Sequence, residues 1–249
     1  MVSIIGHRGG LGLWPENTIA GFLKAAALGV DFVELDVHLS SDGEVIVIHV
    51  PTLDRTTLGT GTVVGKTAEE LTRVPIRDAG GECLATLDTV LATLAPGAVR
   101  VLIELKTDPL STPYPDLEAK VIDLVEKHGM DRRVRYLCFV PEVVERVREL
   151  RPEASVATPF QRPTLQMLGG LRNGIRRFQE IPGCIINVER PVLEHCYDLR
   201  LELIGPDRLG VGKVHTTEDL RIWLPRPLTQ LATDFPDRAV AVRRELELA

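Results

Sequence analysis

Short apolar runs alternate with amphipathic segments along the whole chain, and this alternation constrains the fold more than any other feature. Segments of helical spacing follow most of the runs, at 18–28, 116–127, 142–150, 191–201 and 237–247. Eight such units without a linker or a change in composition predict one α/β domain over residues 1–249, a (β/α)8 TIM barrel. An open doubly wound sheet is the alternative. The eight predicted strands lie at Val2–His7, Phe32–His38, Val99–Lys106, Val134–Val140, Ala154–Thr158, Cys184–Val188, Leu209–His215 and Leu231–Thr233.

One further apolar run, Val45–His49, does not fit the repeating unit. It follows the second strand after too few residues for a parallel crossover, so it is expected to return antiparallel as a hairpin arm. Asp42-Gly43 favours a two-residue turn. Counting from that turn places His49 opposite Asp36, on the face that Glu34 also occupies. A different turn would shift this register by one residue.

The charge balance and the cysteines narrow the class of protein. The formal charge is −6, which argues against a nucleic-acid-binding protein acting through a general basic surface. The sequence contains neither a signal peptide nor an apolar stretch long enough for a membrane span. We therefore expect a cytoplasmic protein whose oligomeric state the sequence does not indicate. Four scattered cysteines without metal-site spacing are expected to be reduced: Cys83, Cys138, Cys184 and Cys196.

Three acidic residues stand at the ends of predicted barrel strands. Glu34 and Asp36 belong to "FVELDVH" and Glu104 to "VLIELK". Active sites of such barrels lie where the strands end, so these side chains are expected to converge. Three carboxylates at a partly desolvated end of the barrel repel one another unless a cation lies among them. Oxygen ligands predict one divalent ion, Mg²⁺ or Ca²⁺, with Mn²⁺ as a third candidate.

Histidines and basic residues stand at the same strand ends. His7 and His49 would supply the acid and the base for displacement at phosphorus, because imidazole titrates near neutral pH. Arg8 and Lys106 would hold an anionic phosphate oxygen. The sequence contains no G-x-S-x-G and no H-E-x-x-H motif, which removes the commonest serine hydrolases and zinc proteases.

The segment "GHRGGLGLWPENTIAGFLKAAALGVDFVELDVHLSSDGEVIVIHVPTLDRTT", with "IELK" and "TDFPD" further on, resembles the signature of the glycerophosphodiester phosphodiesterases. The resemblance implies a (β/α)8 barrel that hydrolyses small glycerophosphodiesters to glycerol 3-phosphate and an alcohol with a divalent metal. It implies the same roles for the strand-end residues named above, and a supporting role for Glu16 and Asn17. The short segment after the arm implies a small cap, with residues 59–65 as a mobile loop over the pocket.

The chain departs from the family pattern at several positions. Val50 stands where the family usually has aspartate, and Cys138 where it usually has serine. Gly212 replaces a tryptophan and would remove an apolar wall, while Lys213 or His215 would add a cation at the rim. We therefore expect an alcohol that is bulkier or more anionic than in common members.

Two other functions stay open. One is a lysophospholipase D or sugar-phosphodiester enzyme on the same scaffold, in which a neighbouring hydroxyl can attack in place of water to form a cyclic phosphate. The other is a protein that binds phosphodiesters without hydrolysing them.

Overall fold

Eight parallel strands close into a barrel in the computed structural model, which describes residues 2–161, 165–166, 168–195 and 197–248. β1 pairs with both β2 and β9, so no edge is left between the first and last barrel strands. All eight predicted strands are present, and the predicted barrel is confirmed. Their bounds are β1 Ser3–Gly6, β2 Phe32–Leu39, β4 Arg100–Leu105, β5 Val134–Leu137, β6 Ser155–Phe160, β7 Ile185–Glu189, β8 Leu209–Gly212 and β9 Gln230–Thr233.

Helices surround the barrel, and their caps follow from the sequence. In α1 the Thr18 side chain accepts a hydrogen bond from the Gly21 amide, and Gly29 ends the helix at a φ of 96°. Two helices, α8 and α9, replace the one predicted over 191–201. The helices are α1 Ile19–Leu28, α2 Ala68–Leu71, α3 Leu87–Leu94, α4 Leu117–Lys127, α5 Pro141–Leu150, α7 Leu171–Gln179, α8 Arg190–Glu194, α9 Tyr197–Ile204, α10 Thr217–Trp223 and α11 Pro236–Leu248. None of these helices is long and apolar enough to span a bilayer.

Side chains that point into the barrel form an apolar layer below its mouth. This layer contains Ile5, Phe32, Leu102, Leu137, Ala157, Ile185 and Ala232. Side chains of a strand alternate between its two faces, so the inward residue two positions after Ile5 is His7, after Phe32 it is Glu34, and after Leu102 it is Glu104. The polar strand-end residues therefore stand on an apolar floor at the carboxyl end of the barrel.

The hairpin arm is present as β3, Val45–Val47, antiparallel to the outer edge of β2. The predicted register is wrong by one residue. Val37 pairs with Val47, and the Ile48 amide donates to the Asp36 carbonyl at 3.0 Å, so Ile48 rather than His49 lies opposite Asp36. His49 follows the end of this ladder.

The turn of the arm explains the shift. The Ser40 amide donates to the Glu44 carbonyl at 3.0 Å, which leaves a three-residue loop with Gly43 at a φ of 80°. Asp42 accepts from the amide of Ala68, the first residue of α2, at 3.0 Å. This contact with a later segment holds the longer loop in place of the two-residue turn that Asp42-Gly43 favours by itself.

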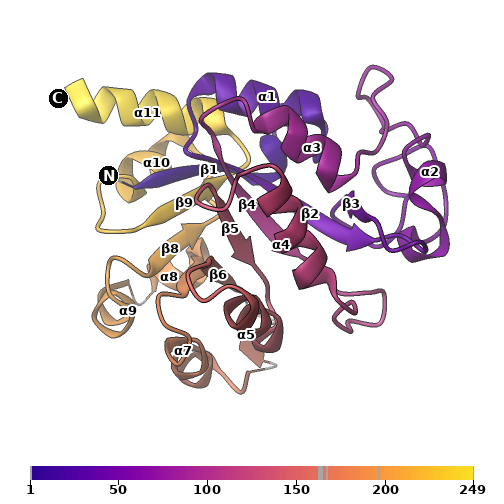
Figure 1. The fold of residues 1–249 in the computed structure, drawn as a ribbon. Helices are drawn as coiled ribbons and strands as arrows, with labels where there is room; N and C mark the ends of the chain where they lie inside the picture. The colour runs from indigo at the N-terminus through magenta and orange to yellow at the C-terminus, as the bar shows by residue number, and fades with distance from the viewer. Residues whose placement is uncertain (1, 162–164, 167, 196, 249) are drawn as a thin grey trace.

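Residues after the arm form a small cap, seen beside β3 and α2 at one end of the barrel (Figure 1). The cap has its own apolar cluster of Ile46, Ile48, Leu53, Val63, Leu71, Ile76 and Leu84. Residues 59–65 are not a loop over the pocket, because Val63 is fully buried in this cluster and none of the seven lines the active-site pocket.

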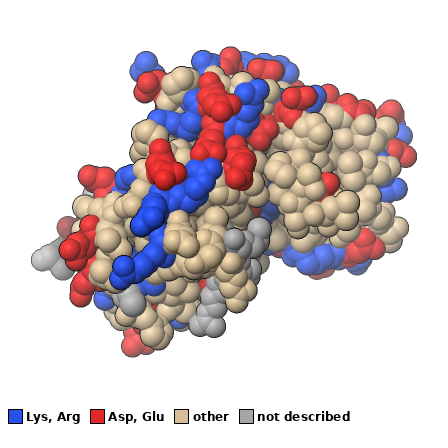
Figure 2. All heavy atoms as spheres, turned by 90° about the horizontal axis from the view of Figure 1, so that it is seen from below, with Lys and Arg blue, Asp and Glu red and all other residues tan. Residues whose placement is uncertain are grey.

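The outer face formed by α5 and α7 carries both signs of charge. Figure 2 shows a band of basic side chains on the face seen there, with acidic side chains beside it. Arg177 of α7 pairs with Glu145 of α5, at 2.5 Å between Nη1 and Oε1, while Arg172 and Arg176 are exposed. These arginines lie on a solvated face, as their helical spacing indicates.

Candidate active site

A pocket of about 310 Å³ opens at the carboxyl ends of the barrel strands. It brings together most of the residues that the sequence singled out. Asp36, which is fully buried, lies below the surface that lines it. The lining includes His7, Arg8, Glu34, His49, Glu104, Lys106 and Lys213, but not His215.

The three predicted metal ligands converge. Glu34, Asp36 and Glu104 each offer a carboxylate oxygen, and these oxygens lie within 4.8 Å of one another. The parallel register of β2 and β4 pairs Asp36 directly with Glu104, while Glu34 lies two residues earlier on the same face. All three are at most 8% exposed.

The three carboxylates repel one another when they are ionised. Burial and the charges of Asp36 and Glu104 raise the pKa of Glu34 well above its ordinary value. Burial likewise raises the pKa of Glu104 to about 7, although Lys106 opposes the shift. Burial also acts to raise the pKa of Asp36, but the cations around it, Lys106 first among them, hold that pKa well below its usual range. Full ionisation of all three therefore requires more positive charge than the pocket itself supplies.

The donor set fits a hard divalent cation. Oδ1 of Asp36 is buried and has no hydrogen-bond partner in the part of the chain that is described, although Lys106 Nζ lies 2.9 Å away. Lys106 Nζ also donates to Glu104 Oε1. Three converging carboxylates are the ligands that Mg²⁺ and Ca²⁺ prefer.

Arg8 links the first strand to the acidic residues. Its backbone adopts a left-handed conformation, with a φ of 50°, and its amide donates to Glu34 Oε2 at 2.7 Å. Its guanidinium contacts Glu16 Oε1 at 3.2 Å and lies 3.5 Å from Asp36 Oδ2. Arg8 and Lys106 thus place two cations beside the carboxylates, within the pocket that a phosphate would enter.

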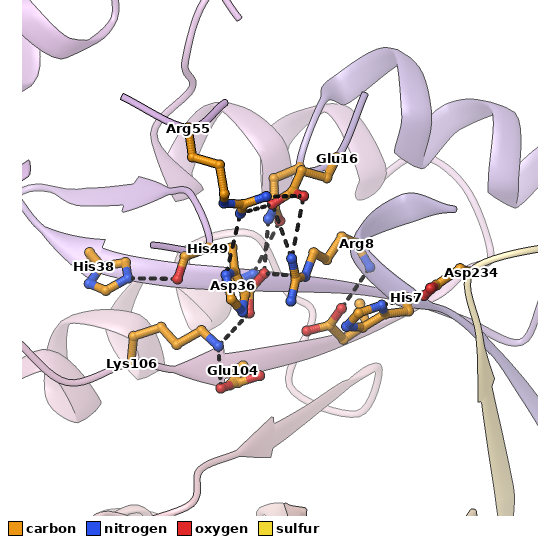
Figure 3. A network of polar contacts seen from close by, with 12 residues as sticks. His7, Arg8, Glu16, Asp36, His38, His49, Arg55, Glu104, Lys106 and Asp234 are labelled. Atoms are coloured by element: carbon orange, nitrogen blue, oxygen red, sulfur yellow. Dashed lines mark hydrogen bonds and ion pairs between the residues drawn. The ribbon is translucent and has the colours of Figure 1, made fainter. Parts of the chain in front are cut away.

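His7 is held by a residue that the sequence reasoning did not assign. Asp234, which follows β9, lies 2.6 Å from His7 Nδ1 through Oδ1 (Figure 3). A carboxylate only accepts hydrogen bonds, so Nδ1 carries the proton and Nε2 keeps its lone pair. Burial lowers the pKa of His7, and the hydrogen bond that its Nδ1 donates to Asp234 opposes that shift. Asp234 is part of the "TDFPD" segment that carries the family resemblance, so the sequence contained a signal for it.

His49 is positioned by contacts to its backbone and its ring. His38 donates from Nε2 to the His49 carbonyl at 3.1 Å and accepts from the Tyr114 hydroxyl at 2.9 Å. Arg55 Nη2 lies 3.4 Å from His49 Nδ1 (Figure 3). Arginine is a donor only, so the proton of a neutral His49 lies on Nε2. Burial lowers the pKa of His49 to about 3.

Glu16 and Asn17 support these groups from the first loop. Arg55 binds Glu16 with two hydrogen bonds, of 2.8 Å from Nη1 and 2.6 Å from Nη2. The side chain of Asn17 donates to Asp36 Oδ2 at 2.9 Å and accepts from the Asp36 amide at 3.2 Å. Glu16 therefore orders the arginine beside His49, and Asn17 orders the Asp36 carboxylate. Arg55 is the second site residue that the sequence reasoning missed.

The departures from the family pattern lie in different places. Val50 is half-buried and does not line the pocket, and Cys138 is buried with a pKa raised to about 12 by that burial. Gly212 and Lys213 line the pocket. His215 instead contacts Asp234, at 3.3 Å between Nε2 and Oδ2. Only the pair at the end of β8 can touch a bound molecule directly.

Sequence comparison connects the chain to known proteins. The model of the glycerophosphoryl diester phosphodiesterase family matches residues 7–178. A glycerophosphodiester phosphodiesterase of Caldanaerobacter subterraneus is 36% identical over 166 residues, which are 64% of this chain and 66% of that protein. A Bacillus subtilis protein is 37% identical over 244 residues, covering 94% of this chain and 95% of its own length.

Solved structures share the fold. A glycerophosphodiester phosphodiesterase from Agrobacterium tumefaciens matches with a TM-score of 0.77 and 28% identity, covering 97% of this chain and all of that one. An Oleispira antarctica phosphodiesterase, solved with its product sn-glycerol-3-phosphate, matches with a TM-score of 0.76 and 20% identity, over 97% of this chain and 96% of its own. These similarities agree with the barrel and extend over nearly the whole chain.

Proposed function

This chain belongs to the glycerophosphoryl diester phosphodiesterase family, and on that premise we propose that it hydrolyses glycerophosphodiesters to glycerol 3-phosphate and an alcohol with one divalent metal ion. Membership makes it a phosphodiesterase. The observation that carries the finer proposal is the convergence of three buried carboxylates within 4.8 Å, at a pocket that two histidines and three cations also line. The Oleispira enzyme with bound sn-glycerol-3-phosphate lends support to that product.

Glu34, Asp36 and Glu104 would hold the ion, which is Mg²⁺, Ca²⁺ or Mn²⁺ by their oxygen chemistry. When bound, a divalent ion offsets the negative charge that develops on the phosphoryl oxygens. Arg8 and Lys106 bind a non-bridging oxygen of the phosphate and orient it. Both side chains already lie beside the carboxylates, so they need little rearrangement to meet the substrate.

His7 acts as the general base. Its Nδ1 proton is held by Asp234, so Nε2 is the nitrogen free to take a proton from the attacking water. Because burial lowers the pKa of His7 below its ordinary value of 6.5, the ring is neutral at pH 7 and ready to accept. A substrate hydroxyl in place of water would give a cyclic phosphate through the same proton transfer.

His49 acts as the general acid. It does so as the imidazolium, which donates its Nε2 proton to the oxygen of the departing alcohol and returns to the neutral ring. The anionic phosphodiester counteracts the effect of burial on this ring, because a nearby negative charge raises the pKa of an imidazole. Proton gain at His7 and proton loss at His49 balance over one turnover.

Release of glycerol 3-phosphate from a glycerophosphodiester, with and without a chelator, tests the function. We expect turnover that a chelator abolishes and added divalent metal restores. Tight binding of an intact diester without turnover would instead favour a binding protein. Faster release of the alcohol from a lysophospholipid than from its deacylated diester would favour a lysophospholipase D.

Asp234→Asn tests how His7 is positioned. Because Asp234 raises the pKa of His7, its removal is expected to move the acidic limb of the kcat/KM profile to lower pH. We expect kcat to fall about 10²-fold, since an amide no longer selects the Nδ1 proton. Asp237→Asn, at an exposed aspartate three residues further on, is the matched control. An unchanged pH profile in Asp234→Asn would show that Asp234 has only a structural role.

A further inference from the structure

The pocket has a second polar wall that the proposed reaction does not use. Its lining residues from β6, β7 and β8 are Pro159, Gln161, Asn187, Glu189, Gly212 and Lys213. These strands lie across the barrel from β2 and β4, which carry the carboxylates. A diester with its phosphorus at the carboxylates has to extend one of its two alcohols along this wall.

Two opposite charges on this wall are free to meet a ligand. Glu189 pairs with Gly212 in the β7–β8 register, and Lys213 follows directly. Within the described part of the chain, neither Glu189 nor Lys213 forms an ion pair within 4.0 Å, with each other or with a third residue. Lys213 is near enough to the reacting groups to lower the pKa of His7.

Asn187 adds a side-chain amide to this wall. Its Oδ1 is buried and has no hydrogen-bond partner among the residues described. Gly212 makes room for this amide, because a Cβ at that position would lie 3.0 Å from Asn187 Nδ2. Nδ2 of Asn187 thus faces Gly212, whereas its Oδ1 faces Gly210, the residue two positions earlier on β8.

The charges on the wall define the chemistry that fits it. Glu189 accepts hydrogen bonds and suits an ammonium group, whereas Lys213 suits a carboxylate. His215, which the sequence suggested as a second cation, is turned to Asp234. The wall is therefore of mixed charge and not simply anion-binding. A pocket of about 310 Å³ is at the small end for ligand sites, so the alcohol has to be compact.

We propose that Glu189 and Lys213 bind a leaving alcohol that carries both an ammonium and a carboxylate group, as the serine of glycerophosphoserine does. This inference rests on the proposed function for the orientation of the diester. It replaces the expectation of a bulkier or more anionic alcohol with a compact zwitterionic one.

Binding to a slowly reacting variant tests the inference apart from turnover. In the His49→Ala background, calorimetry would give Kd for glycerophosphoserine, glycerophosphoethanolamine and glycerophosphoglycerol. We expect the serine diester to bind about tenfold more tightly than the ethanolamine diester, and this margin to vanish in Lys213→Met. Glu189→Gln should weaken the ethanolamine diester about tenfold more than the glycerol diester. Lys120→Met and Glu180→Gln, at exposed positions outside the pocket, are the matched controls.

Equal Kd values for the three diesters, or margins that both variants leave unchanged, would overturn the inference. Turnover of glycerophosphoglycerol by the protein with His49 intact tests the proposed function separately. Different Kd values for the diesters without turnover would support the proposed binding of the alcohol and contradict the proposed hydrolysis. Turnover with equal Kd values would support the proposed hydrolysis and contradict the proposed binding of the alcohol.

Discussion

Glu34→Gln is expected to abolish metal-dependent activity while making the metal-free protein more stable. Glutamine still accepts the hydrogen bond that the Arg8 amide donates to Glu34 Oε2, so the local structure is retained. The variant loses one of three anionic ligands, and we expect kcat to fall about 10³-fold. It also loses the increase in Tm that Mg²⁺, Ca²⁺ or Mn²⁺ produces in the unmodified protein.

The gain in stability has a defined pH dependence. Because the pKa of Glu34 is raised in the folded state, its ionisation destabilises the fold at every pH above the ordinary value of 4.5. The metal-free variant should unfold about 2–4 °C above the unmodified protein at pH 8, or about 1 kcal/mol. This difference should shrink as the pH falls through 4.5, below which the group is protonated in both states. A lower Tm for the variant at pH 8, or full activity, would contradict the proposed metal site.

His7→Ala and His49→Ala are each expected to lower kcat by about 10²–10⁴-fold. Each variant should keep the increase in Tm with divalent metal, because neither ring is among the three converging carboxylates. The two predictions are therefore separable: loss of a carboxylate removes activity and metal binding together, whereas loss of a histidine removes activity alone.

An exposed histidine provides the control for this pair. His195 follows α8 and does not line the pocket, so His195→Ala should change kcat less than about twofold. Phosphorus NMR of the reaction would show whether a cyclic phosphate precedes glycerol 3-phosphate. Near-normal turnover in either His7→Ala or His49→Ala would refute the acid and base roles.

The arm shows where prediction from local sequence stopped. Asp42-Gly43 is a strong two-residue turn signal, yet Asp42 accepts from the Ala68 amide and the turn lengthens by one residue. The predicted register, in which His49 lies opposite Asp36, was wrong. His49 nevertheless reaches the pocket, because the chain leaves the ladder after Val47 and His38 holds the His49 carbonyl. The argument from the turn that placed His49 beside Asp36 is therefore not the reason why His49 lines the pocket.

The sequence by itself determined the barrel and the residues that share its inner face, because strand alternation is local and repeats every two residues. Glu34 and Asp36 are two apart on one strand, and Glu104 ends the next barrel strand. Only the tertiary structure decided the contacts that join distant segments. Asp234 reaches His7 because β9 closes the barrel against β1, and Glu189 and Lys213 share a wall because β7 pairs with β8. Such contacts depend on the closure and register of the whole sheet, which no single segment of sequence specifies.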